Sequence, residues 1–184
     1  AFDADARADD LGEAVDVVGL DAGGGLDMSD ASLDAISDDF DTVQFGQTGQ
    51  TAALTLDRTA GDLAIGSNLL FTADGAGGVV TLNSAVDTSA SAGNDITVDA
   101  SAIDLGADLT TNGGAIALND PTDLTANVTL QSAGGAITFA QTLDASTAGT
   151  ETLDIDAGAT GAVTFTGLVG GTTRLGLLTI TDAG

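Results

Sequence analysis

The sequence predicts an all-β fold, a parallel β-helix (β-solenoid) with three short strands per coil of about 20–26 residues. The first observation is an internal repeat. A Gly-led apolar strand recurs at residues 113–118, 134–139 and 161–165. In this alignment Ile116, Ile137 and Val163 share one position, with steps of 21 and 26 residues. Repeats of this length, built from short apolar alternations, are typical of solenoids.

The second observation is a period of two that begins at Thr42. Apolar residues alternate there with small polar ones, and clusters of Gly, Asp and Asn separate the segments as turns require. We therefore expect solenoid repeats over residues 43–184. The expected strands centre on 43–45, 54–56, 63–65, 69–71, 80–82, 96–98, 103–105, 116–118, 128–130, 153–155 and 178–180.

One unit shows how the coil closes. Three strands are separable within about 21 residues, at Ala115–Leu118, around Leu124 and at Val128–Leu130. Successive coils would stack about 4.8 Å apart, with inward residues in ladders. The register between Val80 and Ile116 stays open, because Ile96 follows Val80 by only 16 residues. One strand in that stretch would then belong to another side of the coil.

The third observation is the composition. Apolar residues make up 43% of the chain but aromatic residues only 3%, and Gly supplies 26 of the 184 positions. A globule of this size usually anchors its core with several large rings. A solenoid has a narrow interior that stacked Val, Ile, Leu and Ala can fill, so the composition favours the solenoid.

Residues 1–42 predict an acidic, helical or irregular N-terminal segment that serves as a cap or an assembly arm. They hold twelve Asp and one Glu against one Arg, a net charge of −12. Apolar residues at helical spacing over Ala4–Val18 allow a short helix, a loose arm is also considered, and Gly23–Gly25 then breaks the pattern. Residues 28–36 predict one helical turn, started by Ser29 or Asp30, that connects strands.

The net charge of −25 limits the partners. Three Arg stand against 28 acidic residues, so nucleic acid is not expected, because neutralising phosphates requires Lys and Arg. Membrane insertion is not expected either, since no apolar run approaches the ~18 residues of a span. Dense carboxylates suit a salty medium, where charges are screened within a few ångströms. Calcium on the acidic surface is left open, with its ligands unknown.

The inventory of side chains predicts no enzyme, no catalytic residue and no cofactor. Without His, Cys or Lys the chain lacks the usual nucleophile–base pairs, imidazole metal ligands and phosphate-loop lysine. The three cations, Arg7, Arg58 and Arg174, are far apart in the sequence. Asp154 and Asp156 flank Ile155 and would point outward about 7 Å apart. They could form an inverting glycosidase pair or half a calcium site, or simply a solvated face.

A row of small outward side chains is the other candidate surface. The row consists of the outward residue at one position of the Gly-led strand, namely Thr81, Ala117, Thr138 and Thr164. Such a row could present hydroxyls to ice or sugar. The simpler interpretation is that Thr favours a pleated strand and stacks well on itself.

The repeats resemble those of giant filamentous-haemagglutinin-like exoproteins. The resemblance is carried by residues 134–139, 151–158, 161–167 and 169–181, and by a connector at 26–36. It implies a right-handed parallel β-helix in a secreted or cell-surface protein that serves as a stalk, adhesin or filament. It implies no catalytic residues.

The last predicted strand, Leu177–Thr181, is as apolar as an interior one, although solenoids need polar caps at their ends. We therefore expect the protein's partner to be itself, either within a longer chain or through end-to-end stacking in which residues 1–42 cover a neighbour. The expected function is an extracellular, non-catalytic stalk or filament subunit. The alternative is a calcium-dependent adhesin or carbohydrate-binding module that docks divalent cations or surface glycans.

Overall fold

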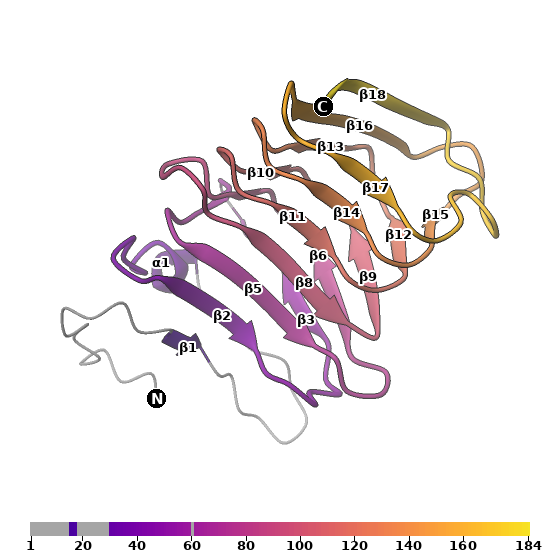
Figure 1. Cartoon of the computed structure of the whole chain (residues 1–184). Coiled ribbons are helices and arrows are strands. Elements are labelled where there is room, and N and C mark those ends of the chain that lie inside the picture. Colours follow the sequence, from indigo (N-terminus) through magenta and orange to yellow (C-terminus); the bar gives the residue numbers. More distant parts are fainter. Residues whose placement is uncertain (1–14, 18–29, 60) are drawn as a thin grey trace.

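The computed structural model describes residues 15–17, 30–59 and 61–184, and within them the chain forms a three-sided column of stacked coils (Figure 1). From β2 to β16 each coil contributes one strand to each of three parallel sheets, called sheets A, B and C in the order in which the chain visits them, whereas the last coil adds β17 and β18 and only an isolated bridge from Val169 to Leu143 in sheet B. The sequence-based prediction of a β-solenoid is therefore confirmed. Helix is confined, in the described part, to one short turn.

The strands of each sheet follow one another along the column. Sheet A contains β1 (Val15–Val17), β2 (Thr42–Gly46), β5 (Asn68–Ala73), β8 (Ile96–Ala100), β11 (Ile116–Leu118), β14 (Ile137–Phe139) and β17 (Val163–Phe165). Sheet B contains β3 (Leu54–Leu56), β6 (Val79–Leu82), β9 (Ala102–Leu105), β12 (Thr122–Leu124) and β15 (Leu143–Ala145). Sheet C contains β4 (Leu63–Ala64), β7 (Val86–Asp87), β10 (Leu109–Thr110), β13 (Val128–Gln131), β16 (Thr152–Gly158) and β18 (Leu177–Ala183).

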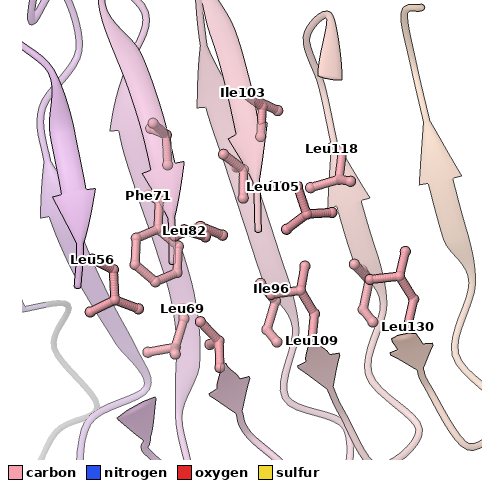
Figure 2. Packing of buried hydrophobic residues seen from close by; sticks show 14 of the residues in the cluster. Leu56, Leu69, Phe71, Leu82, Ile96, Ile103, Leu105, Leu109, Leu118 and Leu130 are labelled. Carbon is pink, nitrogen blue, oxygen red and sulfur yellow. The ribbon is translucent and has the colours of Figure 1, made fainter. Parts of the chain in front are cut away.

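The predicted repeat alignment is the register of sheet A. Ile116 pairs with Ile137, and Ile137 pairs with Val163, on successive coils. The same column continues back through Ile96 and Leu69. Inward residues of all three sheets are buried and form one core along the column, as Figure 2 shows for its central part. Every coil thus repeats the same three-sided packing.

The register left open between Val80 and Ile116 is now resolved. Val80 lies in sheet B, where it pairs with Leu54 and Ile103, whereas Ile96 lies in sheet A. The short step from Val80 to Ile96 is therefore a step between sides and not between coils. Along sheet A the coils measure 26 and 27 residues up to Ile96, then 20 and 21 residues up to Ile137, and 26 residues from Ile137 to Val163, because the corner loops differ in length.

The N-terminal segment differs in part from prediction. Val15–Val17 is a strand that pairs with β2, so the helix or loose arm considered over Ala4–Val18 is wrong at these residues, and the remainder lies outside the described residues. The alternation of Val15, Asp16 and Val17 fits a strand once an edge of sheet A is available to pair with it. The Gly23–Gly25 breaker also lies outside the described residues.

The predicted helical connector is α1 (Asp30–Leu33), and it helps to close the end of the core that adjoins β2. Leu33 is buried, and Ile36 and Phe40 pack partly buried against the core. Carboxylates hold the segment in place: Asp38 accepts from the Gly66 amide at 2.6 Å and Asp34 from the Arg58 guanidinium at 2.6 Å. We refer to residues 30–40 as the N-terminal cap.

The Gly-Gly pairs that lead the sheet A strands have two separate causes. The first glycine, Gly113 or Gly134, has a positive φ that other residues rarely adopt. The second lies against the preceding coil: a Cβ on Gly135 would overlap the Gly114 carbonyl oxygen, well under the 3.0 Å limit. The repeat motif therefore marks a corner where backbone touches backbone.

Buried hydroxyls line the same corner, between sheets C and A. Thr111 Oγ1 donates to the Gly114 carbonyl at 2.6 Å, and Ser132 Oγ donates to the Gly135 carbonyl at 2.6 Å. Thr88 makes the equivalent bond to Asn94 one coil earlier. These bonds satisfy carbonyls that the turn leaves without strand partners, which is the requirement for burying a polar backbone group.

Candidate functional site

Many of the abundant aspartates act as backbone acceptors at the corners of the column. Asp95 Oδ1 accepts from the Ala115 amide at 2.6 Å, and Asp108 Oδ1 accepts from the Thr129 amide at 2.7 Å. In each case the donor lies about one coil away in the sequence. These carboxylates tie successive coils together and satisfy turn amides, so part of the acidic composition serves the fold.

A second set of aspartates forms a column on the outer face of sheet B. Asp104, Asp123 and Asp144 occupy equivalent positions on β9, β12 and β15 and pair in register. We call them the acidic column. The first and last carboxylates of the acidic column have hydrogen-bond partners. Thr81 Oγ1 donates to Asp104 at 3.4 Å, and Asp144 accepts from the amides of Thr172 and Thr173 at 2.8 and 2.9 Å. Asp123 is exposed between two like charges.

The environment raises the pKa of two aspartates. Although Asp123 is exposed, partial loss of hydration of its carboxylate, followed by repulsion from Asp144 and Asp104, raises its pKa above the ordinary value of 3.8. At the corner between sheets A and B, burial and repulsion from Asp120 and Asp74 raise the pKa of Asp99 in the same way. At both places, repulsion between neighbouring carboxylates destabilises the folded protein, and protonation or salt screening relieves that repulsion.

This repulsion predicts a pH response. The pKa of Asp123 is higher in the folded protein than in the unfolded chain, so its ionised form destabilises the fold at neutral pH. Stability should rise as the pH falls through the raised pKa toward 3.8. Asp123→Asn should be more stable than wild type at pH 7 in low salt, and the difference should shrink on acidification. Urea unfolding at pH 7 and near pH 3.8 measures this. An Asp123→Asn variant that is less stable than wild type at pH 7 would contradict it.

Glu151 behaves in the opposite way. Burial alone would raise its pKa, but hydrogen bonds from the Thr147 amide at 3.0 Å and the Ser146 hydroxyl at 2.9 Å outweigh that effect and lower the pKa. Its contribution to stability is therefore present at neutral pH and is lost as the pH falls through the lowered pKa. Glu151 holds the loop between β15 and β16.

The predicted pair Asp154 and Asp156 lies on β16 and points outward from sheet C. Asp154 is exposed beside Thr129 and Thr179 of the adjoining coils. The Asp156 carboxylate accepts from the Gly158 amide at 3.0 Å. In the described part of the chain, no group of three acidic side chains is arranged to hold a metal ion.

The structure corrects the predicted row of small outward residues. Ala117, Thr138 and Thr164 do form a column on sheet A, and Thr97 precedes them. Thr81 is not a member, because β6 belongs to sheet B, where Thr81 stands between Thr55 and Asp104. The error follows from treating Val80–Leu82 as a repeat of the Gly-led strand. The row continues into Leu70 and Gln44, so it is not a uniform hydroxyl array.

The two arginines that the structure describes, Arg58 and Arg174, are not gathered into a site. Arg58 is buried beneath the N-terminal cap, with its side chain 4% exposed, and forms an ion pair with Asp34. Arg174 lies exposed in the last coil, beside Gly149. Arg7 lies outside the described residues. The two described arginines are therefore at opposite ends of the column.

The exposed apolar residues collect on the last coil. Leu168 is 71% exposed, Leu177 58%, Ile180 46% and Val169 39%. Val163, Phe165 and Leu178, whose equivalents on the preceding coil are buried, are only partly covered. We call the open side of this coil the C-terminal face. It lies at the end of the column opposite β2 (Figure 1).

Fold and surface together define a parallel β-solenoid with an acidic exterior. Comparison with protein-family models, curated proteins and solved structures gives no match. None of the described helical residues forms a helix long and apolar enough to cross a membrane. The structure therefore establishes the architecture, and the function is argued from the surfaces above.

Sequence reasoning did not find the acidic column. Its members are separated by 19 and 21 residues, close to the repeat step, and each lies between two inward residues. The pattern that indicates the acidic column, an outward acidic residue between two inward residues, is clear around Asp104 and Asp123. Around Asp144 it was weak, because the inward residues there are Leu143 and the small Ala145.

Proposed function

We propose that this protein is a non-catalytic structural β-solenoid, a stalk or filament element of a secreted or cell-surface repeat protein. The observation that carries the proposal is the continuous three-sided core, in which each coil packs on the next in one register. In such a column each coil contacts only the coils next to it, so the protein extends along one axis, which suits a spacer or scaffold.

The use of the polar side chains supports the same function. The carboxylates with backbone partners stabilise corners between coils, and the Asp154–Asp156 pair faces outward on an open strand. Of the two described arginines, Arg58 lies at the other end of the column, and Arg174 lies in the last coil beside Gly149, in the loop that precedes β16. General acid–base hydrolysis by two carboxylates needs an acid with a raised pKa in a substrate-holding site. In the acidic column the one carboxylate with a raised pKa, Asp123, is exposed, and the neighbouring Asp144 is buried and held by the amides of Thr172 and Thr173.

The function is tested by locating the protein on its source cells. We expect an antibody against the chain to label intact cells, and electron microscopy of the labelled material to place it on projecting rods. A cytosolic marker labelled only after permeabilisation is the control. Labelling that requires permeabilisation would contradict the proposed location, and a measurable hydrolytic or lyase activity would contradict the non-catalytic role.

The acidic column favours one second candidate, a calcium-dependent adhesin or carbohydrate-binding module. Its three carboxylates attract divalent cations through their charge, although in the described residues they do not form a group close enough to coordinate one, and the neighbouring Thr81 adds a hydroxyl. In this candidate, calcium would relieve the repulsion around Asp123 while a glycan docked on the face of sheet B.

Melting curves separate the two candidates. As a scaffold, the protein should gain similar stability from calcium, magnesium and sodium salts once they are compared at equal ionic strength, because all of them screen the same repulsion. A specific calcium site would instead raise the melting temperature at millimolar calcium beyond the magnesium response. Asp123→Asn is the matched variant: it should reduce the general salt response, and it should abolish a calcium-specific one.

A further inference from the structure

The corner between sheets A and B brings together polar side chains from three successive coils. Thr72 and Asp99 are register partners near the ends of β5 and β8, and both belong to the outward set of residues on their strands. Asp120 lies in the turn before β12 and reaches back to the same place, where its Oδ2 accepts from the Ala100 amide at 2.9 Å. Residues about one coil apart in the sequence therefore meet at one point of the surface.

Two carboxyl groups at this corner are in contact. Those of Asp99 and Asp120 are close enough to hydrogen-bond to each other, and Asp74 adds a further negative charge nearby. Asp99 and Asp120 are both half-buried, so water screens their repulsion incompletely. Two ionised carboxylates only accept hydrogen bonds and have no proton to donate. The contact therefore requires either a shared proton or a cation.

A buried hydroxyl beside this pair lacks a partner. Thr72 is 4% exposed, and its Oγ1 is shielded from solvent and forms no hydrogen bond with any residue that the structure describes. A buried hydroxyl without a partner is unfavourable and is rare in native proteins. On the strand at its other side the register partner is Gly46, which has no side chain to serve it. The hydroxyl therefore needs a partner on the side of Asp99.

A shared proton would account for the carboxyl pair alone, whereas a cation also gives the hydroxyl oxygen a partner. We propose that Thr72, Asp99 and Asp120 form a calcium site at the corner between sheets A and B. The two carboxylates supply charge and oxygen ligands, and the hydroxyl supplies a neutral oxygen. Water completes the shell, since calcium takes about six to eight oxygen ligands. With two carboxylates, the site differs from a group of three acidic side chains, which the described residues do not contain.

The spacing of the strands favours calcium over magnesium. Thr72 and Asp99 lie on adjacent strands, which are about 4.8 Å apart. Calcium–oxygen distances of about 2.3–2.6 Å let one ion bridge two oxygens up to about 5 Å apart, whereas magnesium, at about 2.0–2.1 Å, bridges only about 4.2 Å. Because the protein supplies few of the ligands, we expect a dissociation constant of about 10⁻⁴–10⁻³ M.

The site is separate from the acidic column and goes beyond both candidate functions. The carboxylates of the acidic column project from sheet B, whereas Thr72 and Asp99 project from sheet A. A cation at this corner ties three coils together in a scaffold as well as in an adhesin. The melting curves that compare the two candidate functions are therefore recorded in the Asp99→Asn background, where this site is removed.

Calcium binding is tested on the complete 184-residue chain by isothermal titration calorimetry at pH 7, with magnesium in parallel. In about 1 M sodium chloride, attraction to the acidic surface is screened within ~3 Å. We expect one calcium ion per chain and weaker binding of magnesium. Asp99→Asn should lower the calcium affinity at least about tenfold. Asp123→Asn removes the same charge from the acidic column, and it should leave the affinity within about twofold of wild type because exposed charges are screened.

The hydroxyl is tested with two substitutions of Thr72. Thr72→Val keeps the shape of the side chain without its oxygen, and it should lower the calcium affinity at least about threefold. Thr72→Ser keeps the oxygen and should retain most of the affinity. Circular dichroism in calcium-free buffer checks that each variant is folded.

Melting temperatures give a second readout. Asp99→Asn removes one of two repelling carboxylates, so in calcium-free buffer it should melt at or above the wild-type temperature. Calcium at about 10 mM should raise the melting temperature of the wild type and leave that of Asp99→Asn little changed. A destabilised fold would lower both values, whereas the loss of a binding site changes only the response to calcium.

Three results would overturn the proposal: calcium binding no stronger than magnesium binding, an affinity that Asp99→Asn leaves unchanged, or an equal loss in Asp123→Asn, which would show that calcium responds only to surface charge. A loss in Thr72→Ser as large as that in Thr72→Val would exclude the hydroxyl from the ligands and reject the site in this form. None of these results affects the surface-labelling test of the scaffold role.

Discussion

Gly135→Ala should lower the free energy of unfolding by at least about 3 kcal/mol, one of the two largest effects expected from a single substitution in this chain. The new Cβ would overlap the Gly114 carbonyl oxygen of the preceding coil. That oxygen also accepts the Thr111 hydroxyl at 2.6 Å, so a shift of the backbone would break a buried hydrogen bond as well. Urea unfolding followed by circular dichroism measures the loss.

Gly93→Ala is the matched control. Gly93 has a φ of 85°, but a Cβ there meets nothing within 4 Å. The control therefore carries the backbone strain of a positive φ, about 1 kcal/mol, without an overlap. A loss in Gly135→Ala no larger than that in Gly93→Ala would show that the coils can separate at this corner, contrary to the packing described here.

Phe139→Ala should cost about 3–5 kcal/mol, because it removes a large, fully buried ring from the column. Phe139 stacks on Phe165 with ring centroids 5.1 Å apart and an interplanar angle of 14°. The neighbouring side chains belong to stacked coils whose backbones are hydrogen-bonded, so the cavity cannot collapse fully. Urea unfolding, with the slope held to the wild-type value, gives the loss.

Phe165→Ala removes the other ring of the same stack and is the control. Phe165 lies on the last coil and is only partly buried, so its removal should cost clearly less than that of Phe139. Because both variants lose the ring–ring contact equally, their difference isolates burial. Equal losses would contradict the difference in burial between Phe139 and Phe165.

Much of the fold was predictable because, in a solenoid, equivalent residues of successive coils recur in the sequence at steps of about one coil. The positions of Ile116, Ile137 and Val163 predict three stacked strands, and the structure pairs these residues directly. Strands with only one inward apolar residue were missed, such as β7 at Val86 and β10 at Leu109. Two residues do not establish a period, and these strands form because the adjoining coils supply partners.

The surfaces were less predictable than the core. Outward residues are under no packing constraint, so Thr81 could be assigned to the wrong side of the coil from sequence alone. The raised pKa of Asp123 depends on Asp144 and Asp104, which the fold brings into register on neighbouring strands. Charge repulsion acts through space, and only the register says which carboxylates are neighbours.

By itself the sequence determined the all-β solenoid, the repeat alignment and the acidic exterior, because alternation, glycine spacing and charge are local properties that survive any arrangement of the coils. Only the tertiary structure decided which side each strand joins and which aspartates repel one another. Those properties depend on corner loops of unequal length, and their effect on register appears only when the whole column is stacked.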